Sequence, residues 1–389
     1  MKRRTGESAQ RGAALRGAET FPWKAAVGRL LAWYRSSARD LPWRRDRDPY
    51  RVWISEVMLQ QTRVSTAGPY FERFLRRFPT LEHLAEAETD EVLKAWEGLG
   101  YYARARRLPE AARAIRAAGG FPRDAKALLS LPGFGPYTAG AVASIAFGLP
   151  EPVLDGNVRR VWCRLFALGE PDGGDLRRRL WDLSRLAVQS GPPGDVNQAL
   201  MELGATVCGP RRPACPTCPL RRECAAAGEG RPESYPVPRA RKAHPEWAVA
   251  VALLWRGDRF LVTKRPPGGL LGGLWELPGG KVEEGESPEG ALAREIREEV
   301  GADCEILAGL PVVRHAYSHF KVVLHPFDCR LAPGSPPPAP AVPHRWILPE
   351  ERGSLAFPAA TNRIFERRFA AEDLRAAEEP ASFGEGERE

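Results

Sequence analysis

The first half of the chain carries apolar residues at helical spacing, interrupted by breaks rich in proline and glycine. Residues 53–58, 92–99 and 139–147 are amphipathic stretches of this kind, and strand-like alternation is scarce. The pattern predicts one mostly helical domain over residues 21–225. No apolar run approaches the roughly 18 residues that a membrane helix needs, so we expect no membrane partner.

The pattern changes after a linker, which we place at residues 226–245 because they are rich in glycine, proline and charge. Beyond Trp247, two apolar runs flank Arg256-Gly257-Asp258 and predict a β-hairpin. A glycine-rich loop, a helix and further strand-like segments follow. We therefore expect an α+β domain over residues 246–369.

Both ends of the chain offer little apolar surface to bury. We interpret residues 1–20 as a disordered basic tail, with an organelle transit peptide as the alternative. Residues 370–389 are interpreted as a loose acidic tail.

Composition narrows the class of protein. A chain of 389 residues with 43% hydrophobic and 27% charged residues is too apolar to be mostly disordered or fibrous. Its net charge of +8 favours a polyanionic partner without naming one.

Four of the seven cysteines are clustered, with the spacing Cys208-x6-Cys215-x2-Cys218-x5-Cys224. Four thiolates so close together indicate a metal site. Zinc is one candidate, but zinc ribbons usually pair two C-x2-C knuckles and this segment has one. The uneven gaps favour a cubane iron–sulfur cluster, and zinc stays open as the alternative.

The loop between the first two cysteines carries Arg211 and Arg212. If the two cysteines bind a metal, they hold this loop rigid, and its guanidinium groups could face a phosphate backbone. The alternative is a solvated charge pair.

Residues 124–147 predict a helix, a tight turn and a second helix. The turn contains Gly133 and Gly135, and Pro136 suits the first position of the helix that follows. Free N–H groups at such a turn can hold a phosphate. The segment resembles the helix–hairpin–helix DNA-binding motif.

A hairpin followed by a four-cysteine loop resembles the endonuclease III superfamily of DNA glycosylases. The segments Trp53-Ile54-Ser55-Glu56-Val57-Met58-Leu59-Gln60-Gln61-Thr62 and Gly98-Leu99-Gly100-Tyr101-Tyr102-Ala103-Arg104-Ala105 resemble the adenine DNA glycosylases of the MutY type. The resemblance is close over residues 21–225 and looser beyond them.

This resemblance implies an all-α helix–hairpin–helix glycosylase domain with a 4Fe–4S cluster loop, joined to an α+β Nudix-like domain. The implied activity is hydrolysis of the N-glycosyl bond of adenine mispaired with 8-oxoguanine or guanine in duplex DNA. The implied setting is the cytoplasm of a bacterium, with the protein acting on nucleoid DNA as a monomer.

Cleavage of an N-glycosyl bond requires a protonated leaving base and a stabilised cationic sugar, which suits one protonated and one ionised carboxyl group. The candidates are Glu56 and Asp155. Apolar neighbours should raise the pKa of Glu56. The plainer interpretations are that Glu56 is an ion-paired helix glutamate and that Asp155 is a helix N-cap. In the resembling family the matching glutamate protonates adenine, the aspartate stabilises the sugar and the residue matching Asn157 orients the site.

Tyr137 occupies the position where superfamily members that also nick the backbone carry a lysine nucleophile. A phenol forms no imine, so we expect a monofunctional enzyme that leaves an abasic site. An aromatic packing role is the alternative.

Base flipping leaves a gap in the duplex that the protein has to fill. By resemblance, Gln61 and Tyr101 are the wedges, and Thr62, Leu99 and Gly100 lie near the partner base. Trp43 and Arg44 line the adenine pocket. The alternatives are a core position for Trp43 and a surface ion pair for Arg44.

The second domain contains Gly280-x5-Glu286-x7-Arg294-Glu295-Ile296-x-Glu298-Glu299-x-Gly301-Ala302, which resembles a complete Nudix box. Glu295, Glu298 and Glu299 share a helix face at positions i, i+3 and i+4, and three carboxylates so grouped could hold Mg²⁺. An acidic solvated face is the alternative. Adenine glycosylases usually carry an eroded box, so the intact box is either idle or part of a working site, and we favour an idle box.

The segment Arg314–Phe320 resembles the loop with which the family recognises 8-oxoguanine. Ser318 would bond the damaged base beside His319, and Tyr317 replaces a phenylalanine and adds a hydroxyl that needs a partner.

Three other functions stay open at this point. They are a related glycosylase with lyase activity, a nucleoside-diphosphate hydrolase with a DNA-binding appendage, and a non-catalytic redox-sensing DNA binder. Tyr137 and the second domain argue against the first, and only the intact box supports the second.

Overall fold

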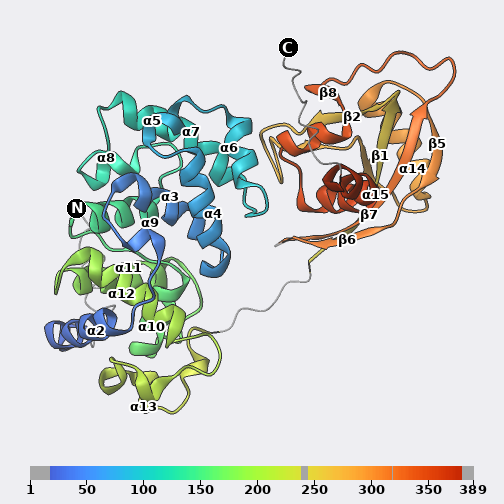
Figure 1. Ribbon diagram of the computed structural model, residues 1–389. Helices are drawn as coiled ribbons and strands as arrows, with labels where there is room; N and C mark the ends of the chain where they lie inside the picture. Colours follow the sequence, from blue (N-terminus) through green and yellow to red (C-terminus); the bar gives the residue numbers. More distant parts are fainter. Residues whose placement is uncertain (1–17, 238–243, 318, 379–389) are drawn as a thin grey trace, which may run out of the picture. The chain divides into compact units, whose positions relative to one another are not determined.

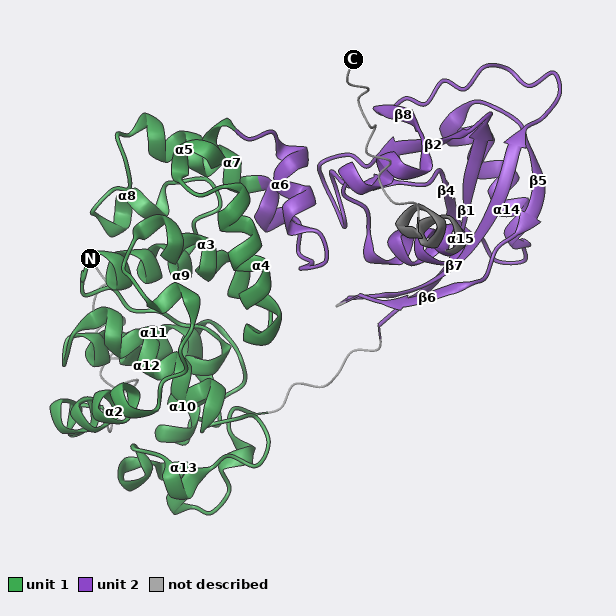
Figure 2. Ribbon diagram, viewed as in Figure 1, with its two compact units in different colours: residues 1–86, 107–241 green, residues 87–106, 242–389 purple. Residues whose placement is uncertain are grey.

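The computed structural model describes residues 18–237, 244–317 and 319–378 (Figure 1). The chain divides into two compact units, residues 1–86 with 107–241 and residues 87–106 with 242–389 (Figure 2). Residues 87–106 thus fall in the second unit, although the sequence predicted them within the helical domain. Within that unit, Asp90 pairs with Lys264 at 2.6 Å and Glu97 accepts a hydrogen bond from the Phe357 N–H at 2.8 Å.

The first unit is built from helices, as the hydrophobic pattern predicted. The α-helices are α2 (Trp23–Ser37), α3 (Pro49–Leu59), α4 (Val64–Arg77), α5 (Leu81–Glu86), α7 (Ala103–Ala117, which begins in the second unit), α8 (Ala125–Leu129), α9 (Pro136–Ala141), α10 (Gly156–Leu165), α11 (Gly174–Val188), α12 (Pro193–Thr206) and α13 (Ala225–Gly228). Short turns add η1 (Pro42–Arg44), the π-helical η2 (Val142–Ala146), η3 (Cys215–Thr217), η4 (Arg221–Glu223) and η5 (Pro232–Ser234).

Helix α12 packs against α2, α10, α11 and η2, and α3 packs against α4, α9 and η1. Glycines allow the close approaches of α12. A Cβ atom on Gly194 would lie 2.6 Å from the Ser144 carbonyl oxygen, and one on Gly204 would lie 2.5 Å from the Asn157 Cβ atom. These contacts bring α3, α9, α10 and α12 together around one site.

The predicted hairpin is present between α8 and α9. Gly133 has φ +77°, a conformation that favours glycine, whereas Gly135 has φ −97° and serves as the N-cap of α9. Phe134, between them, is buried and stacks on Trp53 with 5.5 Å between ring centroids. Only the first of the two glycines is therefore required by backbone conformation.

The second unit contains α6 (Thr89–Trp96) and a mixed sheet. Its strands are β1 (Glu246–Arg256), β2 (Arg259–Lys264), β3 (Trp275–Glu276), β4 (Gly279–Lys281), β5 (Cys304–Gly309), β6 (Val313–Ala316), β7 (Lys321–Leu331) and β8 (His344–Ile347). The order is β3-β2-β1-β7-β5, and β4, β6 and β8 pair with β1, β7 and β2. Strands β1 and β7 are parallel, and β1 and β2 form the predicted antiparallel hairpin.

Helices cover both faces of this sheet. Alternate residues of β1 point to opposite faces: Ala250, Ala252 and Leu254 pack with α14 (Pro288–Glu295), and Val251 and Leu253 pack with α15 (Ala359–Glu378). The turns η6 (Ile296–Val300, π-helical) and η7 (Pro349–Ser354) complete the unit. The α+β class that the sequence predicted is confirmed.

The termini and the linker are described in part. Helix α15 continues to Glu378, so the backbone of residues 370–378 is helical, where a loose tail was predicted. Short helical turns occupy the first part of the predicted linker, and residues 1–17, 238–243 and 379–389 lie outside the described residues. Within the described part of the chain, none of the helices has the length and apolarity that a membrane crossing requires.

Candidate active site

Glu56 lies on α3, where Asp48 caps the helix by accepting a hydrogen bond from the Arg51 N–H and Pro49 takes the first position. Its side chain is buried among apolar neighbours, with 4% of the residue exposed. The Tyr137 hydroxyl on α9 donates a hydrogen bond to Glu56 Oε2 at 2.5 Å. Burial raises the pKa of Glu56 to about 7, and the Tyr137 hydrogen bond opposes that rise. The carboxyl group is thus poised to exchange a proton near neutral pH.

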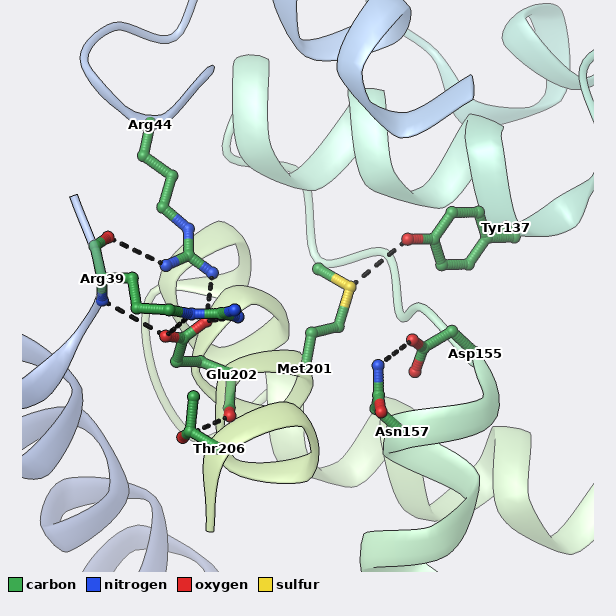
Figure 3. Close-up of polar contacts among 8 residues, drawn as sticks. All are labelled: Arg39, Arg44, Tyr137, Asp155, Asn157, Met201, Glu202 and Thr206. Carbon is green, nitrogen blue, oxygen red and sulfur yellow. Dashed lines mark hydrogen bonds and ion pairs between the residues drawn. The ribbon is translucent and has the colours of Figure 1, made fainter. Parts of the chain in front are cut away.

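Asp155 is both the N-cap of α10 and a neighbour of Glu56. Its Oδ1 accepts from the Val158 N–H at 2.7 Å, and its Oδ2 accepts from the Asn157 side-chain amide at 2.9 Å (Figure 3). Burial raises its pKa, while these hydrogen bonds oppose the rise. The capping role weighed in the sequence analysis is therefore correct, and it leaves the carboxylate fixed in the site.

Arg160 is a site residue that the sequence analysis missed. Its Nη2 donates to Asn157 Oδ1 at 2.8 Å and to the Gly204 carbonyl at 2.6 Å, and its Nε donates to the Cys208 carbonyl at 2.7 Å. The residue thereby connects the Asn157 side chain to the cysteine loop. Its position three residues after Asn157 on a predicted helix was the available signal.

Helix α12 contributes Met201 and Glu202, which the sequence analysis also missed. The Tyr137 hydroxyl lies 3.3 Å from Met201 Sδ. Glu202 is fully buried and pairs with Arg39 and Arg44, which its sequence position gave no reason to expect (Figure 3). Burial raises its pKa, but the hydrogen bonds from both arginines outweigh burial and hold it at about 2.

Trp43 and Arg44, predicted to line the adenine pocket, lie on the short turn η1. Trp43 is 6% exposed and packs edge-on against Phe71 at 5.5 Å, which is the core position weighed as its alternative. Arg44 pairs with a buried carboxylate rather than a surface one.

Several predicted DNA contacts have unusual backbone conformations. Gln61, Tyr101 and Arg212 have positive φ angles of 59°, 52° and 43°, a region that non-glycine residues rarely adopt. Gly100 has φ +71°. Such conformations persist where the surrounding structure enforces them, and they concentrate at functional sites.

The remaining predicted contacts differ in exposure. Gln61 is exposed and Thr62 half-buried in the first unit, whereas Leu99 in the second unit is buried. The Gly100 carbonyl accepts hydrogen bonds from the Trp96 indole and from Arg104, each at 3.1 Å, and this holds the turn that presents Tyr101.

The four clustered cysteines border one hollow, lined also by Arg164, Val207, Pro213, Arg221, Ala227 and Pro232. Within residues 18–237, 244–317 and 319–370, no group of three or more His, Cys, Asp or Glu side chains could hold a single metal ion. A hollow lined by four thiols fits the donor set of a 4Fe–4S cluster, in which each iron takes one thiolate.

Arg164, buried on α10, makes several polar contacts with the cysteine loop. Its Nη1 lies 3.3 Å from Cys208 Sγ and donates to the Gly209 carbonyl at 2.6 Å, and its Nη2 donates to the Pro210 carbonyl at 3.0 Å. Burial raises the pKa of Cys218 to about 12 and also raises that of Cys224. Bound metal cations would therefore be needed to keep these thiols ionised. Arg211 and Arg212 are exposed on the same loop.

Two glutamates of the predicted Mg²⁺ face, Glu295 and Glu298, act electrostatically on the third, Glu299. The helix turns π-helical over Ile296–Val300, so the spacing of Glu295, Glu298 and Glu299 no longer follows a regular α-helix. Arg294 donates to Glu295 at 2.9 Å and to Glu298 at 3.3 Å, and Glu299 accepts from the Gly279 N–H at 3.2 Å. The carboxylates also have these protein partners, and the shared metal-binding face stays a prediction.

In the predicted recognition loop, Tyr317 is half-buried and stacks on Phe320 at 4.7 Å. Its hydroxyl accepts a hydrogen bond from the Ala360 N–H at 3.4 Å, which supplies the partner that the substitution requires. His319 is exposed, with its ring 6.0 Å from that of Tyr101 in the same unit. Ser318 lies outside the described residues.

Comparisons with known proteins place this geometry in context. Residues 54–185 match the model of the HhH-GPD superfamily base excision DNA repair protein, and residues 250–367 match that of the NUDIX domain. The adenine DNA glycosylase of Homo sapiens is 38% identical over 397 residues, which cover 87% of this chain and 73% of the human protein.

Two microbial relatives carry the same name. That of Buchnera aphidicola subsp. Acyrthosiphon pisum is 33% identical over 307 residues, covering 78% of this chain and 85% of its own. That of Schizosaccharomyces pombe is 31% identical over 376 residues, covering 78% of this chain and 81% of its own.

Proposed function

The chain belongs to the adenine DNA glycosylases, and from that premise we propose that it removes adenine mispaired with 8-oxoguanine or guanine from duplex DNA. The proposed reaction is hydrolysis of the N-glycosyl bond, leaving an abasic site. The observation that carries the proposal is the buried Glu56 carboxyl group, whose pKa of about 7 keeps a large share of it protonated at neutral pH.

Glu56 acts as the general acid in this proposal. The protonated carboxyl group donates to the departing adenine, and the resulting carboxylate then accepts a proton from the attacking water. The Tyr137 hydroxyl supports the ionised form through its 2.5 Å hydrogen bond to Oε2. The acid and its conjugate base are thus both accessible near neutral pH.

Asp155 supports the developing positive charge of the deoxyribose. Its two oxygens are held by the Val158 N–H and the Asn157 side chain, so the carboxylate is oriented before the substrate arrives. Asn157 acts as the orienting residue and is itself held by Arg160.

In this proposal Tyr137 makes the enzyme monofunctional: it removes the base but has no lyase activity. A phenol cannot form the imine by which lysine-dependent lyases cleave the backbone. The hydroxyl also donates its hydrogen bond to Glu56, so Tyr137 supports the general acid and does not attack the deoxyribose.

We propose that the strained turns of each unit and the hairpin of the first unit contact DNA. Gln61 and Tyr101 enter the duplex, Thr62, Leu99 and Gly100 lie near the partner base, and Trp43 and Arg44 border the adenine pocket. The hairpin with Gly133 and Gly135 and the exposed pair Arg211 and Arg212 hold phosphates. The positive φ angles of Gln61, Tyr101 and Arg212 and the net charge of +8 support this assignment.

The second unit is proposed to read the oxidised guanine through Tyr317, Ser318 and His319. Support comes from the exposed His319 and from its closeness to Tyr101, which places two proposed DNA contacts in one unit.

The proposed cofactor is a 4Fe–4S cluster held by Cys208, Cys215, Cys218 and Cys224. The hollow that these thiols border and the buried Arg164 guanidinium beside Cys208 Sγ support it. When bound, such a cluster supplies four metal–thiolate bonds that fix the loop carrying Arg211 and Arg212. Every proton transfer described above takes place at protein side chains.

We also propose that the protein acts as a monomer on nucleoid DNA in the bacterial cytoplasm. A bacterial protein among its relatives supports this setting. Light scattering after size-exclusion chromatography should give the mass of one chain, and a dimeric mass would refute the monomer.

The proposed role of Glu56 is tested by excision from an adenine:8-oxoguanine duplex. We expect Glu56→Gln to lose excision while retaining DNA affinity, because the amide has no acidic proton to give. Glu72→Gln, an exposed change on α4, serves as the matched control and should excise normally. Substantial activity of Glu56→Gln would refute the assignment.

A further inference from the structure

Asn197 on α12 is a polar side chain with no exposed surface. Its Nδ2 donates to Ser144 Oγ and to the Glu151 carbonyl, each at 2.8 Å, and its Oδ1 accepts from the Val153 N–H at 3.2 Å. Both donor hydrogens and the acceptor oxygen of the amide are therefore used. One side chain joins α12 to the π-helical segment η2 and to the loop over residues 147–155, which leads into α10.

The two segments joined by Asn197 each carry a residue of the proposed reaction. Helix α9 continues directly into η2, and its first turn holds Tyr137, which donates to Glu56. The loop ends at Asp155, shortly after the N–H that Asn197 holds. The bonds of Asn197 therefore connect the support of the acid to the support of the residue that is proposed to stabilise the sugar.

The loop also lies directly against α9, with no side chain between the two backbones at Gly140. A Cβ atom on Gly140 would lie 2.3 Å from the Pro152 carbonyl oxygen, so only glycine allows this approach. Val153, the next residue of the loop, is completely buried. A buried N–H that loses its partner stays unsatisfied unless the backbone moves. The geometry of the loop thus depends on Asn197.

We infer that Asn197 is a positioning residue for base removal: it holds the loop that ends at Asp155 against the helical segment that continues from Tyr137. The inference rests on the proposed role of Asp155 in stabilising the cationic sugar. In the contacts described above Asn197 bonds to neither carboxyl group of the site, and it acts through the backbone of the loop. It thereby fixes the spacing of the reacting groups before DNA binds.

The test is single-turnover excision from an adenine:8-oxoguanine duplex at increasing protein concentration, which separates the maximal rate constant from the half-saturating concentration. Asn197→Ala removes all three hydrogen bonds. We expect its maximal rate constant to fall by about tenfold or more, because the Asp155 carboxylate is displaced from the developing charge. The half-saturating concentration should stay within about twofold of the wild type, because Asn197 is none of the proposed DNA contacts.

Two further variants separate the loop from the rest of the network. Ser144→Ala removes one bond of Asn197 and leaves both bonds to the loop, so the melting temperature should fall while the maximal rate constant stays near that of the wild type. Gly140→Ala leaves the Asn197 side chain intact but pushes the Pro152 carbonyl away, and it should lower the rate constant as Asn197→Ala does.

A merely structural role would give a different readout. Loss of stability lowers the folded fraction of the protein, which raises the half-saturating concentration and leaves the maximal rate constant unchanged. Tyr50→Phe is the matched control, because it removes a buried hydrogen bond to the Phe78 carbonyl in the same unit. Its maximal rate constant should equal that of the wild type.

The outcomes separate the inference from its premise. Excision by Asp155→Asn at the wild-type rate would overturn the proposed role of Asp155 and the inference with it. A slow Asp155→Asn together with an unchanged maximal rate constant in Asn197→Ala would overturn the inference alone. Where Asn197→Ala does not fold, Asn197→Ser replaces it, because a hydroxyl has one donor hydrogen for two acceptors. An unchanged maximal rate constant in Asn197→Ser would then overturn the inference.

Discussion

At the scale of single residues, burial of Glu56 lowers the stability of the fold when the carboxyl group is ionised, and the same burial suits the group to acid–base catalysis. Its neighbours along the same helix, Trp53, Ile54, Val57 and Met58, are all buried. Burial disfavours its charge, and the Tyr137 hydroxyl restores only part of the lost solvation. A carboxyl group in such a place has a pKa suited to giving and taking a proton near pH 7.

This burial predicts a pH-dependent stability. Folded Glu56 binds its proton more tightly than the unfolded chain does, so its ionisation destabilises the fold as pH rises from about 4.5 to about 7. Glu56→Gln removes that penalty and should be more stable than the wild type at pH 8, by about 1–3 kcal/mol. Urea unfolding at pH 5 and pH 8 checks this. Lower stability of the variant at both pH values would contradict the account.

Gly204 predicts a second effect at this scale. Because a Cβ atom here would lie 2.5 Å from the Asn157 Cβ atom, Gly204→Ala must push α12 away from α10. We expect excision to fall by about tenfold or more, since Asn157 and the carboxylate it orients are displaced. Single-turnover rates measure this, with Gly228→Ala, where a Cβ atom meets open space, as the control. Equal rates for the two variants would show that the close approach has no bearing on the site.

Residue types could be predicted here better than residue partnerships. Glu56, Tyr137 and Asp155 stand in recognisable segments, and the structure brings Tyr137 and Asp155 to Glu56. Arg39 and Glu202 are 163 positions apart, and no local pattern announces that pair. Long-range ion pairs follow from packing and are therefore invisible to spacing rules.

At the scale of elements, α10 connects two parts of the site. Its N-terminus holds Asp155 and Asn157, and Arg160 and Arg164 on the same helix bond to carbonyl groups of the cysteine loop. A shift of the cysteine loop should therefore move Arg160 and, through it, Asn157, which orients the Asp155 carboxylate.

This connection predicts that Arg160→Gln loses excision by about tenfold or more and also loosens the cysteine loop, because an amide cannot replace the guanidinium contacts. The rate and the loop's resistance to proteolysis measure the two effects. Arg159→Gln is the control, because Arg159 pairs with Asp172 instead. Should Arg160→Gln behave like Arg159→Gln, the helix would not couple the two parts.

The turn after α14 departs from the regular helix on which one sequence prediction relied. The sequence predicted a shared face for three glutamates on the assumption of a regular helix, and the turn over Ile296–Val300 breaks that regularity. The start of α14 follows local rules: Ser287 caps the helix, Pro288 takes its first position and Leu292 is buried.

We expect the Nudix box to be idle, the interpretation that the sequence analysis favoured. We expect Mg²⁺ to leave the melting temperature unchanged and phosphate release from an oxidised deoxynucleoside triphosphate to stay at background, because Arg294 and Gly279 occupy the glutamates. Glu298→Gln should behave as the wild type. Release of phosphate that depends on Mg²⁺ and is lost in Glu298→Gln would establish a second activity.

At the scale of the whole molecule, the two classes of domain were predictable because their periodicities differ. Helical spacing and the β-hairpin signal separate the halves of the sequence without knowledge of contacts. The assignment of residues 87–106 to the second unit was not predictable, since it depends on pairs such as Asp90 with Lys264 that join distant parts of the chain.

The central claim is that two carboxyl groups remove the base without an amine nucleophile. The most direct measurement incubates the wild-type protein with an adenine:8-oxoguanine duplex in the presence and absence of borohydride. We predict release of adenine, a strand that breaks only after alkali, and no protein–DNA adduct with borohydride. A borohydride-trapped adduct, or a duplex that keeps its adenine, would contradict the claim.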